Sequence, residues 1–88
     1  MKQITIKKDN IDQIKDVKID IVVDGNVITS IFNEENVSFS LTKESHIIKL
    51  KVDTLDFKYP IYNFMHVPYG NDKYSFVITI YDGKLTLL

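Results

Sequence analysis

The chain has 88 residues, of which 44% are hydrophobic and 26% charged, so it is sized for one globular domain spanning 1–88. Its 11 basic and 12 acidic residues are interleaved, and the formal net charge is -1. Because of this interleaving no basic patch for nucleic acid is visible, and because every basic residue is lysine no guanidinium is available. The absence of cysteine excludes disulfides and thiolate chemistry.

The beginning of the chain, Met1-Lys2-Gln3-Ile4, leads directly into alternating apolar and polar residues. It lacks the apolar core of a signal peptide, so we expect a soluble, cytoplasmic protein. No apolar run approaches the roughly 20 residues that a membrane-spanning helix needs, so we also expect no membrane span.

The first half of the chain alternates in the manner of strands. Residues 2–7 place Ile4 and Ile6 on one face, which is typical of a half-buried strand. The 8–16 stretch lacks this alternation and is predicted to connect elements rather than to build the sheet. Residues 17–23 alternate again, and Asp24-Gly25 followed by another apolar run predicts a tight hairpin.

Two further strands are predicted over 37–41 and 46–52, separated by polar turns. The 55–73 segment holds both prolines and alternates only in short pieces, so we expect a short edge strand between loops. Residues 74–81 form the most apolar strand, and Asp82-Gly83 turns it into KLTLL. This terminal hairpin could leave an unpaired sheet edge near the C-terminus, through which the domain would self-associate.

Thirteen isoleucines and eight valines favour strands over helices, because β-branched side chains suit a pleated surface. Seven to eight short strands at spacings near ten residues indicate an all-β fold. We therefore predict an antiparallel β-sandwich, immunoglobulin-like or related.

Between Val17 and Asp53 the chain reads VKIDIVVDGNVITSI and then NEENVSFSLTKESHIIKLKV. This order, in which a strand ending in Asp-Gly leads to a second strand and then to a His-x-Ile hairpin, resembles small bacterial β-domains of the PEGA type and short uncharacterised bacterial proteins. The resemblance implies a β-sandwich with an accessory or binding role and no active site.

Candidate groups for chemistry are few. No signature places a serine, a histidine and an acid together as a triad requires, so we do not expect an enzyme. Two histidines twenty positions apart are too few for zinc, and no EF-hand loop occurs. The three scattered glycines build no phosphate-binding loop, so no cofactor is expected. His46, in phase with Ile48, is expected to edge the core and to bond a neighbouring turn.

Seven of the ten aromatic residues lie between Phe57 and Phe76. The phenylalanines suit a core corner, but tyrosines beside proline loops are suited to interfaces. We therefore expect a non-catalytic protein-binding module whose partner meets an exposed sheet edge or a patch of loop tyrosines. Two alternatives stay open, a carbohydrate-binding module that uses the same tyrosines and a small enzyme centred on His66. The predicted binding residues are Tyr59, Tyr62, Tyr69 and His66.

Overall fold

A computed structural model describes all 88 residues, and it contains strands and no helix. No segment is therefore a helix that could cross a membrane. The strands are β1 (Lys2–Lys8), β2 (Ile19–Val23), β3 (Asn26–Ile31), β4 (Asn36–Leu41), β5 (His46–Lys51), β6 (Met65–Val67), β7 (Lys73–Tyr81) and β8 (Lys84–Leu87).

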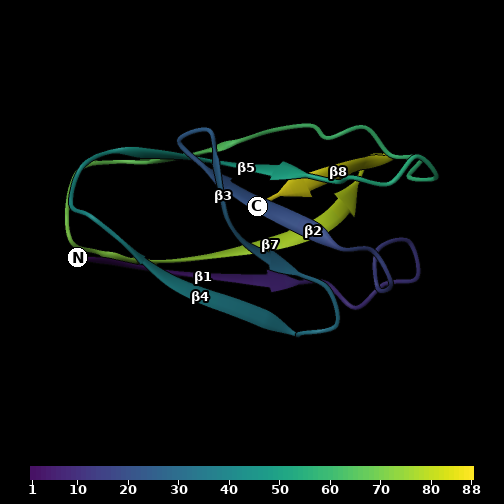
Figure 1. Ribbon diagram of the computed structural model, residues 1–88, viewed down its shortest axis with the longest axis horizontal. Coiled ribbons are helices and arrows are strands. Elements are labelled where there is room, and N and C mark those ends of the chain that lie inside the picture. The colour runs from purple at the N-terminus through teal and green to yellow at the C-terminus, as the bar shows by residue number, and fades with distance from the viewer.

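The strands form two four-stranded sheets, with the orders β4-β1-β7-β8 and β3-β2-β5-β6 (Figure 1). This confirms the predicted all-β sandwich with eight short strands. One pair departs from the antiparallel pattern, since β1 runs parallel to β7, with Gln3 opposite Lys73. The short strand predicted within 55–73 is β6, which lies at a sheet edge as expected.

Two-residue turns close both predicted Asp-Gly hairpins. Asp24 and Gly25 have φ angles of 51° and 86°, and Asp82 and Gly83 have 53° and 73°. Positive φ at both central positions is the type I′ geometry that matches the twist of the flanking strands. The 9–18 segment crosses between the sheets without strand structure, so the predicted connection over 8–16 is present, but β2 begins two residues later than the predicted strand over 17–23.

The core lies between the two sheets and consists of thirteen buried aliphatic side chains. Each sheet contributes the inward face of its alternating strands, for example Ile4 and Ile6 from β1 and Ile19 and Ile21 from β2. Ile14 adds a fully buried side chain from the crossover segment, so that segment closes one end of the sandwich.

Two lysines are buried on the core side of β1, at the two ends of the strand. Lys2 is 0% exposed and Lys8 6% exposed, in phase with Ile4 and Ile6. Burying an ammonium group requires hydrogen-bond partners. Each lysine donates to three backbone carbonyls, Lys2 to those of Thr42, Lys43 and Glu44, and Lys8 to those of Lys15, Val17 and Phe32. The two lysines therefore tie the loops to the ends of the sandwich.

Candidate functional site

The outer edge of β4 is open. β4 pairs with β1 in an unbroken register from Leu41 opposite Lys2 to Asn36 opposite Lys7. The Lys8 N–H donates to the Glu35 carbonyl at 3.1 Å, so Lys8 and Glu35 form a hydrogen-bonded pair. Hydrogen-bonded and non-bonded pairs alternate along an antiparallel ladder, so every second residue of β4 from Glu35 onward bonds to β1. Asn36, Ser38 and Ser40 therefore direct their backbone N–H and C=O groups away from β1. No hydrogen bond in the structure reaches these groups from any other segment.

Nothing in the sequence of β4 protects this edge. Edge strands usually avoid pairing with other chains through charged side chains, proline or a bulge. The NVSFSL sequence of β4 has no charge and no proline, and its register with β1 has no bulge. Its inward side chains, Val37, Phe39 and Leu41, are only half-buried against the core. An added strand would cover them further.

The other edge strands are less suited to pairing. β3 is uncharged, but its register with β2 is interrupted by a bulge beside Ile21 and Val22, and bulges twist an edge away from regular pairing. β6 has three residues and is followed directly by Pro68, which has no N–H to donate. Of the four edge strands, only β4 combines an uninterrupted register with a row of unpaired outward backbone groups.

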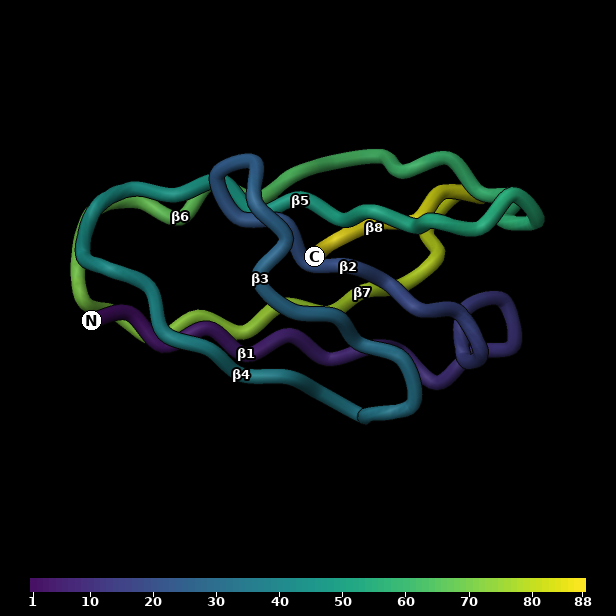
Figure 2. The backbone as a smooth tube through the Cα atoms, viewed as in Figure 1, coloured from purple at the N-terminus to yellow at the C-terminus, as the bar shows by residue number.

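The edge that the sequence predicted to be free, at the C-terminal hairpin, is covered, so that part of the prediction is wrong. The Leu85 N–H donates to the Pro60 carbonyl, and the Tyr62 N–H donates to the Leu85 carbonyl, both at 2.9 Å. The Asn63 side chain accepts from the Leu87 N–H at 2.9 Å and donates to the Leu87 carbonyl at 2.7 Å. Residues 60–63 thus occupy the place of a neighbouring strand, above β8 in the trace of Figure 2.

The three predicted tyrosines are not gathered in one patch. Tyr62 and Tyr69 are exposed, at 62% and 67%, whereas Tyr59 is half-buried with its ring 5.6 Å from that of Phe57. Lys84, at the start of β8, lies over the Tyr62 ring, and Lys43, in the β4–β5 turn, lies over the Tyr69 ring.

These two lysines mark opposite ends of the sandwich. Lys84 lies opposite Tyr81, the last residue of β7. The Lys43 carbonyl accepts a hydrogen bond from the Lys2 side chain. Lys2 directly precedes Gln3, which lies opposite Lys73, the first residue of β7. Nine strand residues span about 26 Å. Tyr62 and Tyr69 therefore cannot contact the same small ligand.

His66 lies in the middle of β6, opposite Ile47, and its side chain is exposed on the outer face of the sheet. No side-chain hydrogen bond involves it, and it lines neither the pocket beside Asp12 and Asp56 nor the pocket beside Lys15 and Glu35. The concave site shared with carboxylates, which a catalytic role of His66 would need, is therefore not formed by either pocket.

His46 has the role expected from its position. Its Nδ1 lies 2.6 Å from Asp24 Oδ2, in the β2–β3 turn, and its Nε2 lies 3.0 Å from Thr42 Oγ1, in the β4–β5 turn. The order carboxylate, imidazole, hydroxyl is that of a hydrolytic triad. However, Nε2 also lies 3.2 Å from the Thr42 backbone carbonyl. The imidazole is thus held against backbone and side-chain atoms of one turn and a carboxylate of the other, so His46 is a structural bridge between two turns.

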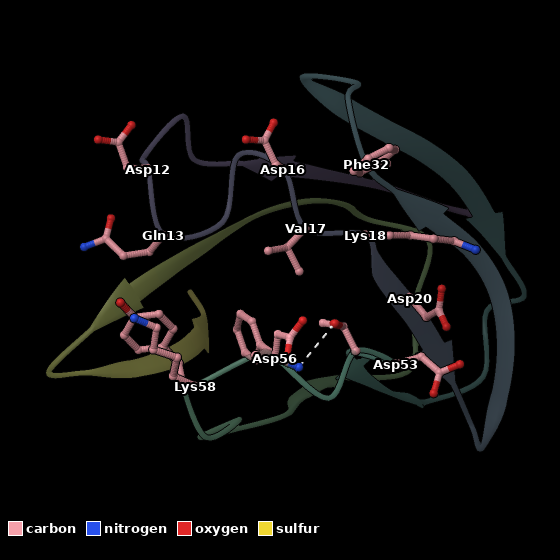
Figure 3. Close-up of a pocket in the computed structure, with 13 residues that line it drawn as sticks. Asp12, Gln13, Asp16, Val17, Lys18, Asp20, Phe32, Asp53, Asp56 and Lys58 are labelled. Atoms are coloured by element: carbon pink, nitrogen blue, oxygen red, sulfur yellow. Dashed lines mark hydrogen bonds between the residues drawn. The ribbon is translucent and has the colours of Figure 1, made fainter.

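One end of the molecule carries an open groove of about 750 Å³, formed by the crossover, the end of β3 and the 53–59 segment (Figure 3). Tyr59 and Phe57 contribute its aromatic lining, and Lys18 and Lys58 its positive charge. Nowhere in the structure do three acidic or histidine side chains converge in a way that could hold a metal ion. The groove carries five aspartates, Asp12, Asp16, Asp20, Asp53 and Asp56.

Comparisons with known proteins identify no relative. No protein-family model matches the chain, and no curated protein and no solved structure is matched to it. The resemblance to PEGA-type domains therefore stays a prediction.

Proposed function

We propose that the domain is a protein-interaction module that binds an extended segment of a partner through the outer edge of β4. The observation that carries the proposal is the row of unpaired backbone groups on Asn36, Ser38 and Ser40, on a strand without charge, proline or bulge. Strand addition gains affinity from main-chain hydrogen bonds and specificity from alternate side chains. The segment that fits is uncharged, with apolar residues at every second position to cover Val37, Phe39 and Leu41.

The contrast with β8 supports this assignment. The outward backbone groups of β8 are satisfied by residues 60–63 within the same chain. A chain that covers one sheet edge and leaves the opposite edge of the same sheet bare is consistent with a partner for the bare edge.

The experiment compares capture of proteins from the native cell by the parent, by Ser38→Pro and by His66→Pro. Ser38→Pro removes one outward N–H from β4, a change that edge strands tolerate. His66→Pro makes the same change on the β6 edge and is the matched control. We expect a captured protein to be lost with Ser38→Pro and kept with His66→Pro, while both variants keep the circular dichroism spectrum of the parent. Equal capture by all three folded proteins would overturn the proposal.

A second candidate function, carbohydrate binding, is favoured by the groove that contains Tyr59. An aromatic ring beside several carboxylates can stack on a sugar and accept hydrogen bonds from its hydroxyls. Tyrosine fluorescence titrations across a glycan panel test it. Binding that Tyr59→Ala abolishes and Tyr69→Ala leaves intact would support this candidate, and no response to any glycan would exclude it for that panel.

A further inference from the structure

We infer that the segment added to β4 is β4 of a second copy of this chain, in an antiparallel pair centred on Phe39. This inference rests on the proposed function and names its partner. β4 itself meets the requirements for the added strand, since it is uncharged and places an apolar side chain at every second position.

The two-fold symmetry of such a pair restricts its register. Residues directly opposite in an antiparallel pair point to the same face of the sheet. Because Val37, Phe39 and Leu41 face the core side and Ser38 and Ser40 the outer side, only registers centred on a residue keep the faces matched. Within β4, the two central choices are Ser38 and Phe39.

In the register centred on Phe39, Ser38 of each copy is opposite Ser40 of the other. These are the residues whose backbone groups are free, so each pair can exchange two hydrogen bonds. On the core side, Phe39 faces its own equivalent and Val37 faces Leu41. All the half-buried apolar side chains of β4 then face apolar partners.

Charge at the strand ends favours this register over the alternative. When the register centred on Phe39 is continued past Asn36 and Leu41, the ends of β4, it brings Glu35 toward Lys43 of the second copy, once at each end of the pair. Centring on Ser38 places Glu35 opposite Leu41 and Lys43 opposite Asn33, which leaves both charges unmatched. Opposite charges across a strand pair stabilise it, whereas a charge facing an apolar residue gains nothing.

Glu34 and Glu44 also come opposite each other in the chosen register. The Glu34 carboxylate is already engaged within its own chain, because it accepts a hydrogen bond from the Phe32 N–H at 2.8 Å. This bond turns the Glu34 carboxylate toward its own turn and limits repulsion between the copies.

The test uses charges placed on the exposed outer face, at Ser38 and Ser40. Ser38→Lys/Ser40→Lys sets lysine opposite lysine in both cross-strand pairs, whereas Ser38→Lys/Ser40→Glu sets lysine opposite glutamate. The matched control is Ser75→Lys/Val77→Lys, which adds the same charge to exposed positions of the central strand β7. Sedimentation equilibrium up to about 1 mM measures dimerisation, since weak dimers still form in that range.

We expect the parent and the β7 control to dimerise, the double-lysine variant of β4 to dimerise at least about tenfold more weakly, and the lysine–glutamate variant to recover. Recovery is specific to the Phe39-centred register, because centring on Ser38 would set lysine opposite lysine at position 38. A parent that stays monomeric, a double-lysine variant that dimerises like the parent, or a lysine–glutamate variant that does not recover would each overturn the inference. A monomeric parent that still captures a protein lost with Ser38→Pro would leave the proposed function standing and assign the edge to another partner.

Discussion

Asp24 and His46, 22 positions apart in the chain, are joined by a 2.6 Å contact between Oδ2 and Nδ1. The other carboxylate oxygen of Asp24 accepts a hydrogen bond from the Ile47 N–H at 2.9 Å. These two bonds, first that from Ile47 and then that from His46, hold the pKa of Asp24 below its ordinary value. The β2–β3 turn is thus anchored to β5 by an ionised carboxylate.

Asp24→Asn should remove a pH-dependent part of the stability. A carboxylate whose pKa is lowered by folding stabilises the protein above its unfolded pKa of about 4, and this stabilisation is lost as the pH falls through the folded pKa. Asparagine tolerates the positive φ of this turn, so the backbone is preserved. Denaturant unfolding should find the parent more stable near neutral pH, with a difference that shrinks below about pH 4. A difference independent of pH would contradict this role of Asp24.

His46→Ala should lower the free energy of unfolding by about 1 to 3 kcal/mol, because it leaves groups in two turns without their partner. The side chain of His46 is only 12% exposed, so water replaces it poorly. His66→Ala is the control and should change stability by less than about 0.5 kcal/mol, since His66 is exposed and unbonded. Urea denaturation of both variants measures the difference, and equal effects would show that His46 is not a bridge.

Lys8 should make stability rise at alkaline pH. Burial lowers the pKa of its amine, and the charges of Asp16 and Glu34 oppose this only in part. Between the lowered folded pKa and the unfolded value of about 10.4, the unfolded chain binds more protons, so stability increases with pH in that window. The free energy of unfolding of the parent should therefore increase relative to that of Lys8→Met as the pH rises. Lys7→Met, at an exposed position of the same strand, is the matched control for replacing a lysine of β1. A difference between the parent and Lys8→Met that does not change with pH would contradict this role of Lys8.

Asn63→Ala should expose the edge of β8. Leu87 is fully buried, and its N–H and C=O would both lose the Asn63 side chain. We expect a loss of about 1 to 3 kcal/mol in unfolding free energy and a greater tendency to aggregate, as an uncovered edge can pair with other chains. Asn71→Ala, in an exposed loop, is the control for both readouts. Light scattering unchanged from the parent would argue against the protective role of residues 60–63.

Much of the fold could be predicted from the chain because its signals are local. Alternation over 2–7 and the two Asp-Gly turns each specify their own geometry without reference to distant residues. Lys2 and Lys8 alternate in phase with Ile4 and Ile6, so the alternation of β1 does indicate that they face the core. Lysine is so rarely buried, however, that its residue type argues against burial more strongly than the alternation argues for it.

The site was harder to predict, because edges depend on which distant strands pair. That residues 60–63 cover β8, and that nothing covers β4, follows from contacts between segments far apart in the chain. Tyr62 and Tyr69 were grouped because they are near in sequence, yet an extended chain carries them to opposite ends of the molecule. Their exposure could be anticipated from the prolines, but their separation could not.

The parallel pairing of β1 with β7 sets the order of events in folding. Gln3 meets Lys73, so the centre of this sheet closes only after about 70 residues have been brought back to the N-terminal strand. During synthesis β1 can pair with β4 early but waits for β7 until residues 73–81 have been made. Contacts of such long sequence separation slow folding and prolong the time in which strand edges are exposed. A chain ending before Lys73 should therefore not acquire the native sandwich.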